Sequence, residues 1–198
     1  PAALDAGAVL VTRCRAERVT LTGGKATGVE AVALDAKGTR TIGRKVTVQA
    51  RAVVAAGGAI NTPGLLLRSK VPDPNGRLGK RTFIHIVSGS TAFMPDIVDG
   101  FYGAPQSIYS DQFTFRDGVT GKVGYKLEAA PLYPMQAMSL SGRSGLDFLK
   151  RAAKDLRKAQ ALIALMRDGF NDESPGGTVS LRKDGSPVLD YQVSPYLW

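Results

Sequence analysis

Hydrophobic and polar residues alternate along much of the first fifty positions of the chain. After a short apolar run at 9–12, alternating stretches occupy 18–21, 27–34 and 39–49, and glycine-containing turns separate the last three. Alternation with a period of two predicts strands with one exposed face, and tight turns between such strands predict antiparallel pairing. The pattern therefore predicts a short strand followed by a three-stranded antiparallel β-meander.

The pattern changes directly after this meander. Residues 52–56 are apolar without alternation, which predicts a strand that is buried on both faces. Gly57 and Gly58 follow, and Thr62 and Pro63 then suit the N-cap and the first position of a helix. Because the two glycines have no side chains, another molecule can lie against their backbone. A strand, glycines and a helix start in this order commonly hold a ribose or a pyrophosphate group.

A stretch rich in proline, glycine and asparagine at 72–79 divides the chain in two. Beyond it, the sequence predicts a strand at 83–94, an irregular segment at 95–111, a strand at 121–130, an amphipathic helix at 146–158 and a hairpin at 178–191. Residues 160–167 could continue the helix or form a strand. Several strands with one segregated helix indicate an antiparallel α+β domain.

The composition is that of a globular protein with a hydrophobic core, because 43% of the 198 residues are hydrophobic and 22% are charged. No apolar run is long enough to span a bilayer, and none resembles a signal peptide. The absence of a signal peptide does not fix the location, which stays open, with a cytoplasmic or peripheral membrane location as the expectation. Cys14 is the one cysteine, which excludes an internal disulfide and a cysteine-rich metal site, and we interpret it as a small, half-buried hydrophobic residue.

The formal net charge is +9, and the densest run of basic residues falls on the predicted helix. This run comprises Lys150, Arg151, Lys154, Arg157 and Lys158. Neither interleaved aromatic residues nor a nucleic-acid-binding motif accompany it, so we expect no nucleic-acid partner. We interpret the run as a solvated helix face or a surface that meets another part of the protein, and a weak attraction to a membrane surface stays open. The alternative to an enzyme is a basic, non-catalytic module that binds polyanions or membrane surfaces.

The sequence gives little support to phosphate-loop, metal or triad chemistry. Lys25 and Lys80 each follow a glycine, but the first glycine and the hydroxyl residue of a Walker motif are absent at both places. His85 is the one imidazole, and neither a second histidine nor a cysteine cluster could complete a metal site with it. The sequence positions no serine and aspartate beside it for a catalytic triad. We interpret His85 as a structural residue.

The sequence around the predicted helix resembles that of a known enzyme family. Residues 58–69, Gly-Ala-Ile-Asn-Thr-Pro-Gly-Leu-Leu-Leu-Arg-Ser, resemble the second signature of the glucose–methanol–choline (GMC) oxidoreductases, which are flavin-dependent alcohol oxidases and dehydrogenases. The family pattern continues with glycine after the serine, whereas Lys70 follows Ser69 here. Further similar segments lie in family order at 15–19, 26–30, 79–85 and 174–181, although Ile84 replaces the aspartate that usually precedes the histidine.

The resemblance implies an α+β fold class with an α/β part. It implies the C-terminal portion of a FAD-binding dinucleotide-type domain, with a β-meander plus a parallel strand and helix, followed by an antiparallel-sheet substrate domain. The FAD-binding part is expected at 1–78 and the substrate-binding part at 79–198, with 160–167 as a strand. The family's Gly-x-Gly-x-x-Gly run and its late catalytic histidine are absent from this sequence. The resemblance therefore implies a central fragment of a longer enzyme.

The resemblance also implies that this enzyme oxidises an alcohol CH–OH group by hydride transfer to the flavin of FAD. Its partners are then a small-molecule alcohol and the remaining parts of the same enzyme. Contacts to the adenosine and diphosphate part of FAD are expected from Ala16, Ala56, Gly57 and Gly58. No catalytic residue is assigned, because the family's histidine is expected beyond the fragment. The isolated chain is accordingly expected to be inactive and to retain no FAD.

Overall fold

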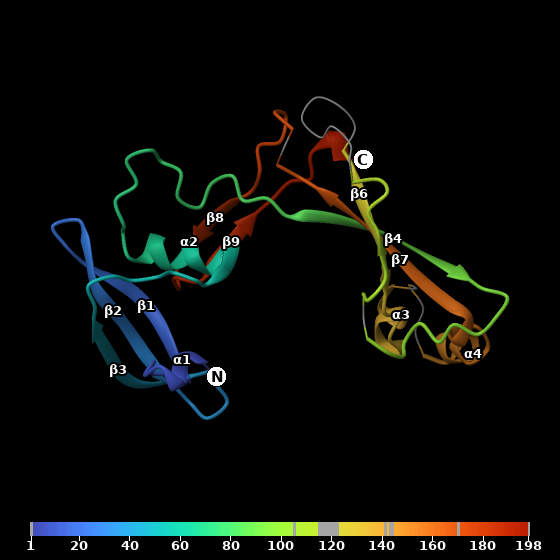
Figure 1. Ribbon diagram of the computed structural model, residues 1–198, viewed down its shortest axis with the longest axis horizontal. Coiled ribbons are helices and arrows are strands. Elements are labelled where there is room, and N and C mark those ends of the chain that lie inside the picture. The colour runs from blue at the N-terminus through green and yellow to red at the C-terminus, as the bar shows by residue number, and fades with distance from the viewer. Residues whose placement is uncertain are drawn as a thin grey trace. The chain divides into compact units, whose positions relative to one another are not determined.

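The computed structural model describes residues 2–104, 106–114, 123–140, 142, 145–169 and 171–197. The chain divides into two compact units (Figure 1). The first unit comprises Pro1–Thr82 and Gly176–Gln192, and the second unit comprises Phe83–Pro175 and Val193–Trp198. The sequence predicted a single division between 78 and 79. The structure differs from this prediction, because residues 176–192 belong to the first unit. The assignment of the parts as FAD-binding and substrate-binding domains stays a prediction.

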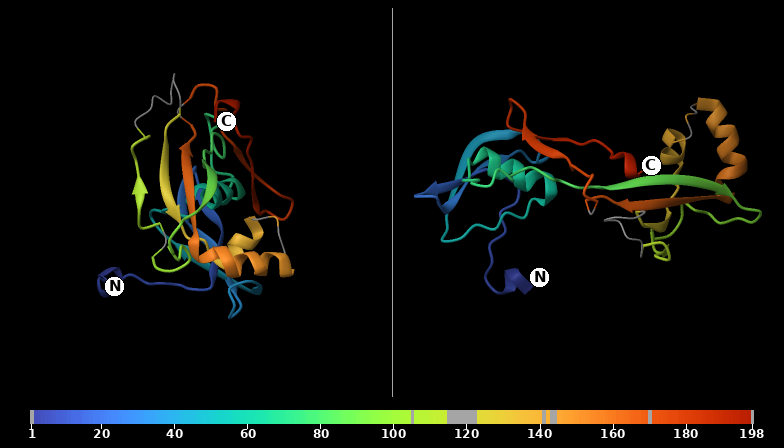
Figure 2. Two further views of the ribbon diagram at one scale, coloured as in Figure 1. Left: turned by 90° about the vertical axis from the view of Figure 1, so that its right-hand side faces the viewer. Right: turned by 90° about the horizontal axis from the view of Figure 1, so that it is seen from above.

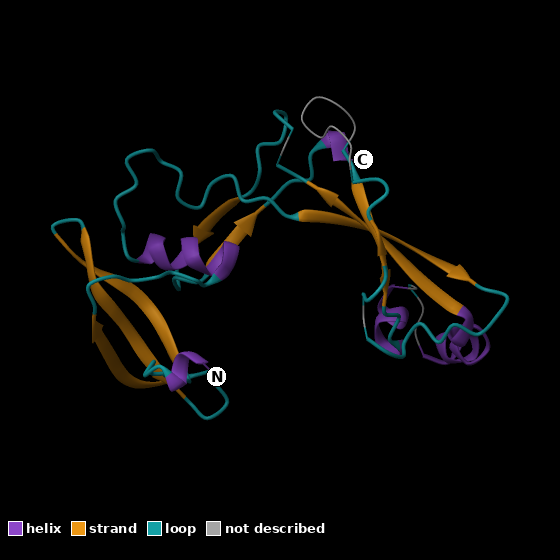
Figure 3. Cartoon of the chain, in the orientation of Figure 1, coloured by secondary structure: helices purple, strands orange, loops and turns teal. Residues whose placement is uncertain are grey.

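The first unit contains the predicted antiparallel meander. After the short helix α1 (Ala2–Asp5), strands β1 (Cys14–Thr22), β2 (Lys25–Leu34) and β3 (Thr41–Gln49) form a sheet in the order β1-β2-β3 (Figure 3). β1 turns into β2 through Gly23 and Gly24, which have left-handed φ values of 58° and 77°. At the centre of the sheet, Val29 stands opposite Val19 on one side and Val48 on the other. The predicted meander is confirmed.

The short strand predicted at 9–12 is wrong. No described strand pairs with these residues, and Val9 is 85% exposed. β1 begins at Cys14, whose partner Ala33 lies at the end of β2. An apolar run forms a strand only where a neighbour satisfies its backbone groups, and β2 offers no residue opposite 9–12.

Helix α2 (Gly58–Arg68) packs against β1 and against a hairpin made of β8 (Thr178–Leu181) and β9 (Pro187–Asp190) (Figure 1). Gly64 is buried and permits the close approach, since a Cβ at this position would stand 2.9 Å from Pro187 Cβ. In the hairpin, Val179 is only 2% exposed, and its N–H donates to the carbonyl oxygen of Gly79 at 2.6 Å. The hairpin predicted from the sequence is confirmed, and its packing explains why it belongs to the first unit.

The doubly buried strand predicted at 52–56 is wrong. These residues form no strand, no described strand pairs with them, and Val54 is 88% exposed. A strand of that kind needs neighbours on both edges, whereas every pairing between the described strands is antiparallel and lies elsewhere in the chain. The parallel α/β part of the predicted fold is therefore not seen among the described residues, and the α+β class with antiparallel sheets is confirmed.

The predicted start of the helix is also wrong. α2 begins at Gly58 with Gly57 as its N-cap, five residues before the predicted cap at Thr62. The hydroxyl oxygen of Thr62 accepts a hydrogen bond from the N–H of Gly57 at 2.8 Å, so it closes the turn that leads into the helix. Pro63 lies inside the helix, where its missing N–H leaves out one helical hydrogen bond.

The second unit is built on a four-stranded antiparallel sheet in the order β4-β7-β6-β5 (Figure 2). Its elements are β4 (His85–Phe93), β5 (Tyr109–Ser110), β6 (Tyr125–Ala130), α3 (Pro134–Leu140), α4 (Gly145–Asp155), η1 (Leu156–Lys158), β7 (Ala159–Arg167) and η2 (Pro195–Leu197). The predicted strands at 83–94 and 160–167 and the predicted helix at 146–158 are confirmed. Of the strand predicted at 121–130, residues 121 and 122 lie outside the described residues.

A buried polar cluster fastens the end of the chain to the second unit. Asp168 is 5% exposed, and its Oδ1 accepts hydrogen bonds from the hydroxyl of Ser174 at 2.6 Å and from the N–H of Gly169 at 2.7 Å. The hydroxyl of Tyr196, in η2, donates to the same oxygen. These donors compensate the burial of a carboxylate, which would otherwise be unfavourable.

Candidate functional site

A cavity of about 510 Å³ lies in the first unit between β1, α2 and the turn that joins β8 to β9. β1, the α2 region and the hairpin each contribute walls, which comprise Arg15, Ala16, Glu17, Gly57, Asn61, Leu65, Arg68, Asp184, Gly185, Ser186 and Pro187. Segments that are distant in the sequence therefore meet at one site. The walls carry two guanidinium groups and two carboxylates, so the site is polar and its charges are mixed.

β1 carries a β-bulge at the cavity wall. Ala16 stands opposite Ala31 and Arg18 stands opposite Glu30, so Glu17 is an extra residue on β1. A bulge interrupts the regular ladder and redirects the backbone groups beside it. The carbonyl oxygens of Ala16 and Glu17 accept hydrogen bonds from α2 at this point.

Arg68, in the last turn of α2, holds the walls of the cavity together. Its Nε donates to the carbonyl oxygen of Glu17 at 2.9 Å, and its Nη2 donates to that of Ala16 at 3.5 Å. Its Nη1 donates to the carbonyl oxygen of Gly185 at 3.1 Å. Because a guanidinium offers five donors in one rigid plane, a single side chain can bind carbonyl groups of two segments at once.

The start of α2 faces open space. Gly58 has a φ of +80°, and a Cβ built on it would meet no atom within 4 Å. A Cβ on Gly57 would stand 3.3 Å from Asn61 Cβ. The N-cap, Gly57, has no side chain that could accept from the first N–H groups of the helix, so these groups are available to a ligand. The partial positive charge of a helix N-terminus favours an anionic group at this position.

The cavity contains two of the four residues that were predicted to contact FAD. Ala16 and Gly57 line the same cavity although they come from different elements. Ala56 and Gly58 flank Gly57 in the chain and are exposed, but they do not line this cavity. All four assignments stay predictions.

Arg68 and the β8–β9 turn are parts of this site that the sequence did not nominate. A residue type does not reveal that an arginine binds main-chain carbonyl groups of distant segments. The turn itself was predicted, but its approach to β1 is a long-range contact that no local pattern encodes. Within the turn, Asp184 Oδ1 accepts hydrogen bonds from the Ser186 hydroxyl at 2.6 Å and the Ser186 N–H at 2.9 Å. These bonds, the hydroxyl first, hold the pKa of Asp184 below its ordinary value.

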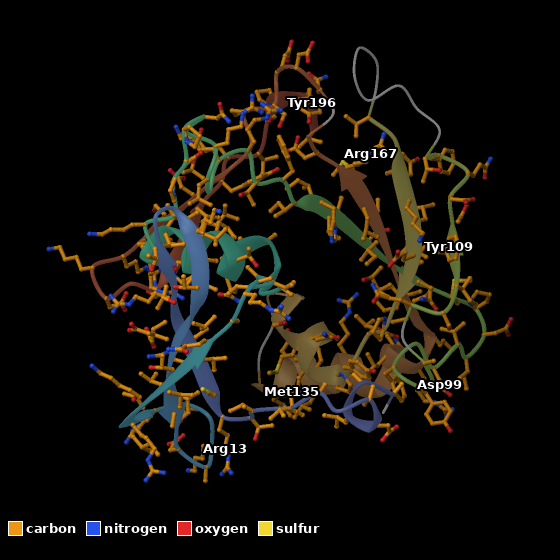
Figure 4. The ribbon with its side chains drawn as sticks, turned by 60° about the vertical axis from the view of Figure 1, so that its left-hand side comes forward. Arg13, Asp99, Tyr109, Met135, Arg167 and Tyr196 are labelled. Atoms are coloured by element: carbon orange, nitrogen blue, oxygen red, sulfur yellow. The ribbon has the colours of Figure 1, made fainter. Side chains whose placement is uncertain are left out.

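His85 is exposed at the start of β4 in the second unit. It lines another cavity, of about 240 Å³, together with Tyr125, Lys126 and Arg167. Arg167, labelled in Figure 4, stands directly opposite His85 in the pairing of β4 with β7. None of the described residues lining this cavity is a carboxylate that could orient the imidazole. The interpretation of His85 as structural stays a prediction.

The basic run on α4 and η1 is partly compensated within the second unit. Arg157 binds both carboxylate oxygens of Asp99, at 2.8 Å and 2.9 Å, and Lys158 Nζ donates to the carbonyl oxygen of Pro95 at 2.9 Å. The two lysines of α4 are exposed. This arrangement is consistent with a solvated helix face.

Membrane-spanning helices and metal-binding clusters are both absent from the part of the chain that the structure describes. Within that part, no helix is both long enough and apolar enough to cross a membrane. The same residues contain no group of three or more histidine, cysteine, aspartate or glutamate side chains that could hold a metal ion.

Known proteins resemble this chain along most of its length. A family model described as GMC oxidoreductase matches residues 1–87. An uncharacterized GMC-type oxidoreductase of Mycobacterium tuberculosis is 32% identical over 98% of the chain and 28% of its own length. A long-chain-alcohol oxidase of Arabidopsis thaliana is 30% identical over 86% of the chain and 24% of its own length. A 2-methyl-1,2-propanediol dehydrogenase of Mycolicibacterium austroafricanum is 31% identical over 73% of the chain and 27% of its own length. The chain thus spans about a quarter of the length of these relatives.

Proposed function

Because the chain belongs to the GMC oxidoreductase family, we propose that it is part of an FAD-dependent enzyme that oxidises an alcohol CH–OH group by hydride transfer to the flavin. The names of two relatives, a long-chain-alcohol oxidase and a 2-methyl-1,2-propanediol dehydrogenase, support an alcohol as the substrate class. The partners in this proposal are a small-molecule alcohol and the remaining parts of the same enzyme.

The observation that carries the proposal is that Ala16 and Gly57 line one cavity. Main-chain groups of Ala16 would contact the adenine edge of FAD. Ala56, Gly57 and Gly58, at the start of α2, would hold the diphosphate. This division of roles gives each of the four predicted residues a contact that depends on its backbone and on a small side chain.

The chemistry of the cavity suits the nucleotide end of FAD. Next to the lining residue Gly57, the open space over Gly58 admits a ligand against the backbone, and the N–H groups of the first turn of α2 can donate to phosphate oxygens. The volume of about 510 Å³ lies within the range of about 300–1,000 Å³ that is usual for ligand sites. Arg15 and Arg68 add positive charge to the walls.

When bound, the flavin supplies the hydride acceptor of the reaction. The part of this chain would be to bind and orient the nucleotide end, with Arg68 fixing the wall formed by Ala16 and Glu17. Oxidation of the alcohol also needs a base within hydrogen-bond reach of the hydroxyl proton. None of the described residues is assigned this role.

The experiment that tests the proposal is Gly58→Ala in the whole protein. The added methyl group would occupy the open space at the helix start, so the amount of flavin bound per protein should fall severalfold. Because Gly58 has a left-handed φ, alanine there also strains the backbone by about 1–2 kcal/mol. Flavin absorbance per protein and the melting temperature are therefore measured together.

Gly76→Ala is the matched control. Gly76 has a φ of +60° and its Cβ would also meet no atom within 4 Å, but unlike Gly58 it is not adjacent in the chain to a residue that lines the cavity. This variant should lose similar stability and keep its flavin. Equal flavin content in the two variants would contradict the proposal. Salt-dependent binding of a polyanion by a protein that binds no flavin would support the basic, non-catalytic alternative.

A further inference from the structure

We infer that the turn between β8 and β9 is part of the cofactor site and that the carboxylate of Asp184 accepts a hydrogen bond from the adenosine half of FAD. The inference rests on the proposed function and adds a contact to it. Asp184, Gly185 and Ser186 line the same cavity as Ala16 and Gly57. The turn therefore faces the space in which the proposal places the nucleotide.

The turn is held in one conformation from within and from outside. The N–H of Gly185 donates to the carbonyl oxygen of Arg182 at 2.9 Å, and the N–H of Arg182 donates to that of Ser186 at 2.9 Å. From outside, Arg68 binds the carbonyl oxygen of Gly185 at 3.1 Å. Because Arg68 also binds the carbonyl oxygen of Glu17 at 2.9 Å, the turn is fixed relative to the wall formed by β1. A fixed turn presents its side chains to a ligand at little further entropic cost.

Asp184 has an acceptor oxygen available. Both of its hydrogen bonds from Ser186 end on Oδ1, and among the described residues none donates to Oδ2. Each carboxylate oxygen offers two lone pairs. Glu17, the other carboxylate of the cavity, is bonded through Oε1 to the charged guanidinium of Arg15 at 2.8 Å, whereas the two donors to Asp184 are neutral groups of Ser186. Of the two acidic side chains, Asp184 is therefore the one whose charge is not paired with an arginine at hydrogen-bond distance, which favours it as the acceptor for a ligand.

The chemistry of the cofactor decides which part Asp184 faces. An ionised carboxylate accepts hydrogen bonds and repels anions. The diphosphate offers only acceptors and negative charge, whereas the adenosine half offers donors in its ribose hydroxyls and its adenine amino group. Asp184 suits the adenosine half, and the N–H groups at the start of α2 suit the diphosphate.

The test measures ligand affinity in the whole protein after removal of its FAD, by calorimetric titration with FAD, ADP and FMN. Asp184→Asn keeps one oxygen for the bonds from Ser186 and replaces the other with an amide N–H₂ group. A hydrogen bond to a charged group is lost, so FAD and ADP should bind about tenfold or more weakly. FMN lacks the adenosine half and should bind as before.

Asp73→Asn is the matched control. Asp73 lies in an exposed turn of the first unit, and its carboxylate accepts hydrogen bonds from the N–H groups of Arg77 at 3.0 Å and Leu78 at 2.8 Å. It does not line the cavity, so its variant should bind all three ligands like the unsubstituted protein. Equal loss of ADP affinity in the two variants would overturn the inference, because any disturbed turn would then have the same effect.

Failure of this inference differs from failure of the proposed function. Full FAD and ADP affinity in Asp184→Asn, together with reduced flavin content in Gly58→Ala, would overturn the Asp184 contact alone. An unsubstituted protein that binds none of the three ligands would overturn both. If Asp184→Asn does not fold, the affinities of the unsubstituted protein for ADP and its analogues test the Asp184 contact instead. ADP should bind more tightly than at least one of IDP, 2′-deoxy-ADP and 3′-deoxy-ADP, which lack the amino group, the 2′-hydroxyl and the 3′-hydroxyl of ADP, respectively, and equal affinities for all four would overturn the inference.

Discussion

Arg68 donates from Nη1 to the carbonyl oxygen of Gly185 at 3.1 Å, although 117 positions separate the two residues in the sequence. The same guanidinium binds the carbonyl oxygens of Ala16 and Glu17. One side chain therefore connects the meander, helix α2 and the hairpin of the first unit. Its three acceptors are main-chain carbonyl groups. The connection therefore depends on the arginine and on the path of the backbone, but not on the side chains of the residues whose carbonyl groups it binds.

Arg68→Ala should lower the free energy of unfolding by about 1–3 kcal/mol, because three partly buried carbonyl groups lose a donor. Arg68→Lys should restore only part of the loss, since an ammonium group lacks the planar fork that reaches both segments. Urea unfolding of the FAD-free protein measures the free energy of unfolding of both variants. Arg18→Ala is the control, because Arg18 forms an exposed ion pair with Glu30 at 2.8 Å and its loss should change the free energy of unfolding less than the loss of Arg68. A larger loss in the control would refute this account of Arg68.

Gly79→Ala should destabilise the first unit more than backbone strain alone explains. Gly79 has a φ of +75°, and an added Cβ would run into the carbonyl oxygen of Val179 and stand 3.5 Å from Leu67 Cδ1. Strain of a left-handed alanine costs about 1–2 kcal/mol. Gly24→Ala isolates that strain, because Gly24 has a φ of +77° and its Cβ would meet no atom within 4 Å. If unfolding midpoints show equal losses for the two variants, the close contact with the hairpin is not supported.

Tyr196→Phe should destabilise the second unit by about 1–2 kcal/mol near neutral pH, because Asp168 loses a buried donor. Burial, and then the hydrogen bond with Asp168, raises the pKa of Tyr196 above its ordinary value of 10.0. A group whose folded pKa is raised contributes stability that is complete below its unfolded pKa and is lost as pH rises through its folded pKa. The difference between Tyr196→Phe and the unsubstituted protein should therefore shrink at pH values above about 10.

The measurement for Tyr196 is the melting temperature at a series of pH values from neutral to alkaline. Tyr102→Phe removes a hydroxyl from a tyrosine that is 87% exposed, and it should change the melting temperature little at any pH. A difference for Tyr196→Phe that stays constant to high pH would show that its hydroxyl does not titrate in the way the contact with Asp168 requires.

The elements that could be predicted from the sequence are those whose partners are close along the chain. Gly23 and Gly24 form the turn that pairs β1 with β2, so alternation on either side sufficed to predict both strands. The hairpin of β8 and β9 was predicted for the same reason. Apolar periodicity and a polar opposite face likewise sufficed for α4.

The features that could not be predicted depend on partners that are distant or are not encoded locally. The apolar run at 52–56 indicates burial, but it does not specify a neighbouring strand, and Val54 is exposed. The packing of Val179 against Gly79 is a long-range contact, and so is the bond from Arg68 to Gly185, next to Asp184 in the cavity wall. The resemblance nominated Ala16 and Gly57, whereas Arg68, which holds the walls of their cavity in place, could be identified only from the fold.

His85→Gln should leave the rate of flavin reduction within about tenfold of the unsubstituted protein. A catalytic base must lie within hydrogen-bond reach of the substrate hydroxyl, and its loss typically costs about 10²–10⁴-fold in rate. His85 is exposed at the start of β4, opposite Arg167, and the described residues lining its cavity include Lys126 but no carboxylate to orient the imidazole. The measurement is anaerobic, single-turnover flavin reduction by an alcohol in the flavin-loaded whole protein, with flavin content and melting temperature recorded beside it. A thousandfold fall in rate with both of these unchanged would make His85 the base and would contradict its interpretation as a structural residue.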